Sequence, residues 1–267
     1  MQRALVGRMA VLSLVALLLS GAAPAHAAAE MTVAEAINQA GRQRMLSQRQ
    51  AVAWLLLGLG VAPQRGQAML QESMDRFDTQ LAALKTYTPN DDVQRALSVL
   101  EREWAGYRAL LGATPTPAAA QHLYQQNDAV QMAAHRLTLA YEKISGAPHD
   151  RLVNIAGRQR MLSQRQAMFY LFQAWQVNPP AARMEMNFAR AEFSSSMHQL
   201  YTGMHRSPDI QATLEQLDRE WMAYRDALTL ERDAAGMRHA AAGIIALSEQ
   251  VLATAERPDG RLEVRLA

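Results

Sequence analysis

The sequence contains no cysteine, which excludes disulfide bonds, thiolate metal sites, a cysteine nucleophile and a lipoprotein anchor. An excess of charge of one sign is also missing, because 27 basic residues are nearly balanced by 25 acidic ones and no run is rich in lysine or arginine. A nearly neutral chain of this kind is not expected to bind nucleic acid through its bulk charge. The fold must therefore be stabilised by packing alone, and any recognition of charge must be local.

Long apolar runs are missing too, since none reaches the roughly 20 residues that a membrane-spanning helix needs. The run at 9–19 follows Arg3 and Arg8 and precedes Ala25-His26-Ala27. This order is typical of a cleaved export signal. We predict that residues 1–27 are a signal peptide and that the mature protein is periplasmic; an uncleaved N-terminal anchor is the alternative.

What the sequence does contain is an internal duplication. The stretch AGRQRMLSQRQA occurs at 40–51 and again, unchanged, at 156–167. The similarity continues further on, where LEREWAGYRALL at 100–111 resembles LDREWMAYRDAL at 217–228. Because protein cores tolerate swaps of similar volume, packing alone rarely demands identity. The unchanged stretch therefore indicates that both places need particular chemical groups.

Apolar residues recur at spacings of three and four in both repeats, which predicts helices rather than strands. Segments rich in glycine, proline and asparagine divide each repeat into four helices. The predicted helices span 32–60, 64–88, 91–111 and 117–145, then 149–177, 180–204, 208–230 and 236–256. Helices of this length with short loops are typical of an up-down-up-down four-helix bundle.

The predicted fold class is all-α, with two tandem antiparallel four-helix bundles. We assign the first to 28–146 and the second to 147–257, and expect a frayed tail at 258–267. The joint Gly146-Ala147-Pro148 is short, so the second bundle must start beside the end of the first. We expect an intramolecular pseudo-dimer with the two first helices side by side. A continuous helix through the joint is the alternative, although proline disfavours helix at the preceding residue.

The repeated stretch places small and polar residues on one helix face, at the alternating spacing of four and three that is typical of a helix–helix seam. The candidate ligand-binding residues on this face are Gly41, Arg44, Gln48, Gly157, Arg160 and Gln164. If the two seams face each other, Arg44 and Arg160 meet near the centre. Two buried cations repel, and an anion between them would stabilise the contact. A guanidinium group offers a planar fork of donors that suits a planar oxyanion.

An alternative interpretation is that these arginines form ion pairs with acids on a fourth helix. The candidate acids are Asp128, Glu142 and Glu249. Arg42 and Arg49 lie on another face, where solvated or ion-paired groups are expected.

The motif N-x-A-G-R-Q-R-M-L-S-Q-R, at 38–49 and 154–165, resembles the signature of the PilJ/NarX-type sensory domain. That family forms the periplasmic N-terminal region of type IV pilus methyl-accepting chemotaxis transducers and of nitrate/nitrite sensor kinases. The resemblance implies a four-helix bundle. In the nitrate sensors of the family, nitrate is held between equivalent first helices by one arginine from each helix. The resemblance implies that these two arginines correspond to Arg44 and Arg160. Residues with an expected supporting role are Arg49, Arg165, Asn38 and Asn154. Nitrate sensors often carry a lysine where this chain has Gln39 and Ile155.

We therefore expect a sensory or binding module for a small oxyanion, nitrate or nitrite first, that relays to a membrane-bound sensor kinase or chemoreceptor. The alternative is a structural or interaction protein derived from a sensor domain, whose seam binds a partner helix or, in a homodimer, its own copy. No phosphate loop, nucleophile elbow or carboxylate dyad indicates an enzyme. No histidine–carboxylate spacing indicates a metal site, and no cofactor is expected.

Overall fold

The computed structural model describes residues 31–203 and 208–256, and these form eight helices without a strand. The predicted signal peptide, 1–27, and the predicted tail, 258–267, lie outside the described residues. The helices are α1 (Val33–Leu59), α2 (Pro63–Lys85), α3 (Asp91–Leu111), α4 (Pro117–Ser145), α5 (Pro148–Ala174), α6 (Pro179–Gly203), α7 (Pro208–Thr229) and α8 (Ala234–Glu256). No helix of this described part is long and apolar enough to cross a bilayer.

Most helix ends follow local signals that are visible in the sequence. Thr32 and Glu35 form a capping box at the start of α1, and Asn90 accepts a hydrogen bond from the Val93 amide at the start of α3. Gly60 and Gly146 end α1 and α4 in the left-handed conformation, with φ of 68° and 60°.

Two predicted helix ends were wrong by three residues. The helix expected to reach 88 ends at Lys85, where the Thr86 hydroxyl donates to the Ala83 carbonyl before Pro89 stops the chain from continuing. The helix expected to reach 177 ends at Ala174, and Trp175 closes it with backbone hydrogen bonds to the preceding turn.

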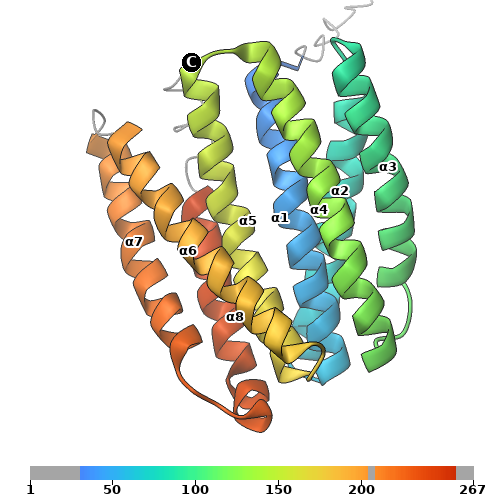
Figure 1. Ribbon diagram of the computed structural model, residues 1–267, viewed down its shortest axis with the longest axis vertical. Helices are drawn as coiled ribbons and strands as arrows, with labels where there is room; N and C mark the ends of the chain where they lie inside the picture. The colour runs from blue at the N-terminus through green and yellow to red at the C-terminus, as the bar shows by residue number, and fades with distance from the viewer. Residues whose placement is uncertain (1–30, 204–207, 257–267) are drawn as a thin grey trace, which may run out of the picture. The chain divides into compact units, whose positions relative to one another are not determined.

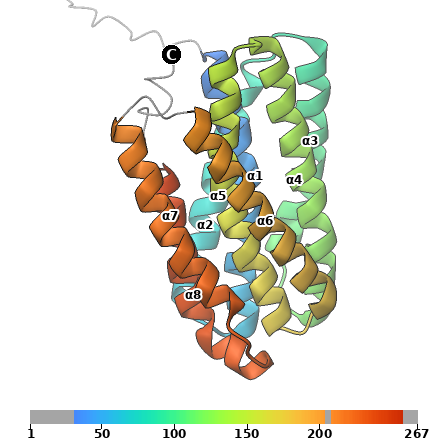
Figure 2. The same ribbon diagram turned by 60° about the vertical axis from the view of Figure 1, so that its left-hand side comes forward.

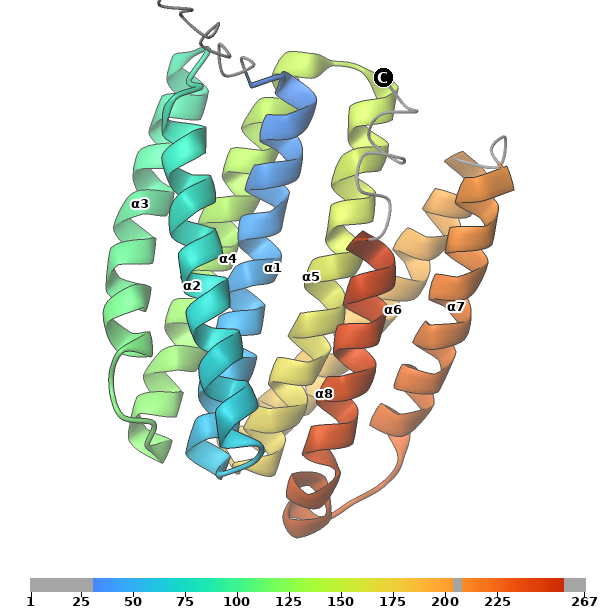
Figure 3. The same cartoon turned by 180° about the vertical axis from the view of Figure 1, so that it is seen from behind.

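The described helices belong to one compact unit. α1 contacts α2 and α4, and α5 contacts α6 and α8, so each set of four forms its own bundle. α1 and α5 also pack against each other along their length and run in the same direction in the middle of the molecule (Figure 1). From behind, α2 and α3 lie on one side of this pair and α6 and α7 on the other (Figure 3). The all-α fold of two tandem bundles as a pseudo-dimer is therefore confirmed.

The two bundles repeat the same core contacts. Phe77 stacks on Trp104 with ring centroids 3.9 Å apart, and Phe193 stacks on Trp221 at 4.1 Å. Between the bundles, Gly58 allows a close approach, because a Cβ there would stand 2.0 Å from the Trp175 ring. The close packing of α1 on α5 brings the two copies of the repeated stretch together.

Candidate functional site

The repeated stretch lies at the contact between α1 and α5, and its central arginines are buried. Arg44 is 1% exposed and Arg160 is 5% exposed. The aligned glycines explain how two large cations fit there. A Cβ on Gly41 would stand 3.0 Å from Arg44 Nη2, so the guanidinium group lies over a bare stretch of helix.

Gly157 places the two arginines relative to each other. A Cβ on Gly157 would stand 3.2 Å from Arg160 Nη2 and 3.4 Å from Arg44 Nη2. Both guanidinium groups therefore reach the same small region of the seam. One small anion could contact both of them, since charge-assisted N–H···O bonds span about 2.7–2.9 Å.

Each of these arginines also crosses to the other repeat. Arg44 Nη2 donates to Asn154 Oδ1 at 2.8 Å, and Arg160 Nη2 donates to Asn38 Oδ1 at 2.6 Å. The two asparagines, expected to have a supporting role, are thus direct partners of the arginines. Asn154 in turn donates to Glu142, one of the acids proposed to pair with an arginine. That carboxylate reaches Arg44 only through the asparagine.

His135 on α4 completes the surroundings of Arg44. Its Nδ1 lies 3.3 Å from Arg44 Nη1. Burial, together with the charges of Arg44 and Arg158, lowers the pKa of His135 to about 4, so the imidazole is neutral and accepts this hydrogen bond. This contact could not be predicted from the sequence, because His135 lies 91 positions from Arg44 in the chain.

The surroundings of Arg44 disfavour its charged form. The pKa of Arg44 is lowered from 12.5 to about 9, first by burial and then by repulsion from Arg158 and Arg160. Glu142 and Glu192 oppose this shift without cancelling it. Within the described residues, every hydrogen-bond partner of Arg44 is neutral. An anion would supply the missing negative charge.

The two glutamines expected among the ligand residues turn toward the fourth helices of their bundles. Gln48 Nε2 donates to Asn127 Oδ1 at 2.8 Å. Asn127 Nδ2 in turn donates to the Ser47 carbonyl and the Tyr107 hydroxyl. Gln164 Nε2 donates to Glu249 at 3.1 Å. Both amides are engaged in joining helices rather than pointing freely toward the arginine pair.

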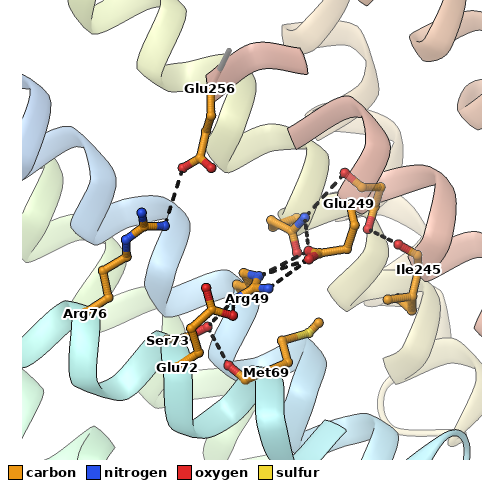
Figure 4. A network of polar contacts seen from close by, with 10 residues as sticks. Arg49, Met69, Glu72, Ser73, Arg76, Ile245, Glu249 and Glu256 are labelled. Carbon is orange, nitrogen blue, oxygen red and sulfur yellow. Dashed lines mark hydrogen bonds and ion pairs between the residues drawn. The ribbon is translucent and has the colours of Figure 1, made fainter. Parts of the chain in front are cut away.

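The second arginine of each box joins the two bundles through ion pairs. Arg49 binds both carboxylate oxygens of Glu249 on α8, with Nη2 at 2.9 Å, and uses Nη1 to bind Glu72 and Ser73 on α2 (Figure 4). Its side chain is only 13% exposed. The interpretation of Arg49 as a group on another face therefore missed a largely buried contact between the repeats.

Arg165 repeats this arrangement in the opposite direction. It binds Asp128 on α4 at 3.1 Å and Glu185 on α6 at 3.0 Å. Each box thus ties its own first helix to the fourth helix of the other bundle. Asp128 and Glu249, proposed as partners of the central arginines, instead bind this second pair.

The remaining candidate groups lie outside the central contact. Arg158 pairs with Glu192 at 2.9 Å, and Arg42 lies 3.7 Å from Glu256. Among the described residues, no cluster of three or more histidine or acidic side chains could hold a metal ion.

Comparison with known protein families agrees with this geometry. The chain belongs to the family described as the N-terminal domain of type IV pili methyl-accepting chemotaxis transducers (PilJ), which matches it twice, over residues 26–137 and 149–244. The two matches correspond to the two repeats. No curated protein and no solved structure gives a match.

Proposed function

We propose that this protein is a periplasmic sensory module that binds one small oxyanion, nitrate or nitrite first, between Arg44 and Arg160. The observation that carries the proposal is the position of the two guanidinium groups, both within 3.4 Å of the place where a Gly157 Cβ would stand. The N-terminal export pattern at 1–27 supports the periplasmic location.

The expected affinity follows from the number of donors. Each charge-assisted hydrogen bond contributes about 1.5–3 kcal/mol. Two to four such bonds, less the free-energy cost of immobilising the ligand, correspond to a Kd in the range of roughly micromolar to millimolar. A planar ion with three oxygens suits the fork of donors on each guanidinium group better than a spherical halide does.

The relay to a membrane partner would use the α1–α5 contact. An anion between the arginines draws the two helices together, and Arg49 and Arg165 tie each of these helices to the opposite bundle. A shift at the seam would therefore be transmitted to α4 and α8. A membrane-bound chemoreceptor or sensor kinase that contacts these helices could detect the change.

One observation favours the second candidate, a structural or interaction protein without a small ligand. Arg44 and Arg160 already donate hydrogen bonds to the asparagines of the opposite repeat, so they join α1 to α5 without an anion. In that case these arginines would be needed for stability in every buffer.

Thermal melting in a panel of sodium salts at equal ionic strength separates the two candidates. Nitrate and nitrite should raise the Tm of the wild-type protein more than chloride or sulfate, because a ligand that binds only the folded state stabilises it. Arg160→Met should abolish this increment, while Arg102→Gln, at a 70% exposed side chain on α3, should keep it. An equal Tm in all four salts would remove the proposed ligand class.

A further inference from the structure

The second bundle contains a cavity that the arginine pair does not use. It has a volume of about 710 Å³ and lies between the end of α5, the first half of α6 and the loop from α7 to α8. The α7–α8 connection at the lower end of the molecule marks its position (Figure 2). Ligand sites in proteins commonly occupy about 300–1,000 Å³. The cavity is therefore large enough for an organic molecule, well beyond the size of nitrate.

Three arginines line this cavity. Arg183 and Arg190 are seven residues apart and so lie on the same face of α6, and neither forms an ion pair within the described residues. Arg232 enters from the loop, where Nη1 donates to the Ala227 carbonyl at 2.8 Å. Two acids, Glu231 and Asp233, also line the cavity, but Asp233 accepts from the Gly236 amide and caps α8. Positive charge is in excess.

Apolar and neutral polar groups form the rest of the wall. Met186, Leu228 and Met237 supply an apolar surface. Gln173 is only 4% exposed, and its Oε1 accepts no hydrogen bond within the described residues. Behind the wall lies the buried Tyr170 hydroxyl, where burial raises the pKa and the nearby Arg232 guanidinium group opposes this shift. A site that combines an apolar wall with arginine side chains suits an amphipathic anion.

The first repeat shows that the fold does not require these polar groups. At the positions that correspond to Gln173, Arg183 and Arg190 it has Leu57, Gln67 and Met74. Where the second repeat has Tyr170, the first has Trp54, whose indole fills this end of the bundle and donates to the Ala113 carbonyl at 3.2 Å. The two arginines of this cavity are therefore a feature of the second repeat that the first repeat does not share.

We propose that this cavity is a second binding site that takes an organic acid, with its anionic group held by Arg183 and Arg190 and its apolar body against Met186, Leu228 and Met237. The site is separate from the α1–α5 seam and depends on different arginines. The protein would then respond to two chemically distinct anions.

Fluorescence titration with a matched pair of probes tests this proposal. The anion 8-anilinonaphthalene-1-sulfonate and its uncharged relative N-phenyl-1-naphthylamine share the same aromatic body. The sulfonate should bind one per chain, at least tenfold more weakly in R183Q/R190M, which carries the residues of the first repeat at both positions. The variant R95Q/R102Q removes two exposed arginines of α3 and should bind as the wild type does. The uncharged probe should not distinguish the three proteins.

A displacement experiment on the wild-type protein provides a second test. Phenylbutyrate should displace the bound sulfonate, whereas 4-phenylbutanol, which has the same body without the charge, should not. Arg44→Met should leave the titration unchanged, so that failure of the seam site and failure of this site are distinguishable. Equal sulfonate affinity in the wild type and R183Q/R190M, or equal displacement by acid and alcohol, would overturn the proposal.

Discussion

Substituting methionine for each of two arginines on the same helix should change the free energy of unfolding differently in anion-free buffer. Arg44 and Arg49 are five residues apart on α1, but Arg44 has neutral partners and Arg49 is ion-paired with Glu249 and Glu72. Methionine keeps much of the side-chain volume in each case and removes the charge. The comparison therefore isolates the electrostatic role of each arginine.

The change in the free energy of unfolding expected for Arg44→Met follows from the surroundings of this side chain. Its pKa falls from 12.5 to about 9, and at about 1.4 kcal/mol per unit the folded state disfavours the cation by on the order of 5 kcal/mol. Against this, Arg44→Met loses hydrogen bonds to Gly41, His135 and Asn154, worth about 1 kcal/mol each. We expect the free energy of unfolding to stay unchanged or to rise by up to about 2 kcal/mol.

Arg49→Met should behave differently, because it leaves Glu249 partly buried without its cation. Removing one partner of a buried ion pair costs about 3–5 kcal/mol, and the exposed fractions of 13% and 21% place this pair near the lower limit. Urea unfolding followed by circular dichroism measures both variants, and the absence of cysteine removes disulfide exchange as a complication. A loss of 2 kcal/mol or more in Arg44→Met, similar to that in Arg49→Met, would refute the reasoning and favour the structural role.

Three further substitutions have defined outcomes. Gly157→Ala should keep or raise stability, since alanine favours helix by about 1 kcal/mol, but it should weaken nitrate binding at least fivefold in a calorimetric titration, because its Cβ would press on both guanidinium groups. Gly58→Ala should lower the free energy of unfolding in urea by about 1–3 kcal/mol, because its Cβ would stand 2.0 Å from the Trp175 ring. The folded pKa of His135 is lowered from 6.5 to about 4, so its contribution to stability is present above pH 6.5 and is lost as the pH falls toward 4. His135→Asn should make urea stability in this window less dependent on pH, and an unchanged slope would contradict the assigned contact.

Much of the fold could be predicted because its signals are local or duplicated. Proline, glycine and capping residues mark the helix ends, as Asn90 does for α3 and Gly146 for α4. The unchanged copies of the motif indicated that the two first helices have equivalent surroundings. From this symmetry, the proximity of Arg44 and Arg160 could be anticipated.

The rest of the site depends on contacts between segments far apart in the chain. Arg49 binds Glu249, 200 positions away, and no periodicity within α1 indicates that α8 of the other bundle covers it. His135 lies on α4 at a position with no special spacing. The helix ends at Lys85 and Ala174 were missed because the apolar periodicity continues beyond them.

The stoichiometry of nitrate binding tests the central claim most directly. The claim is that two repeats of one chain together form one anion site, with one arginine from each. Isothermal titration calorimetry of the wild-type protein, with the oligomeric state checked by light scattering, should give one nitrate per chain and no binding in either Arg44→Met or Arg160→Met. Two nitrates per chain, one nitrate per two chains, or undiminished binding in either variant would contradict a single site shared between the repeats.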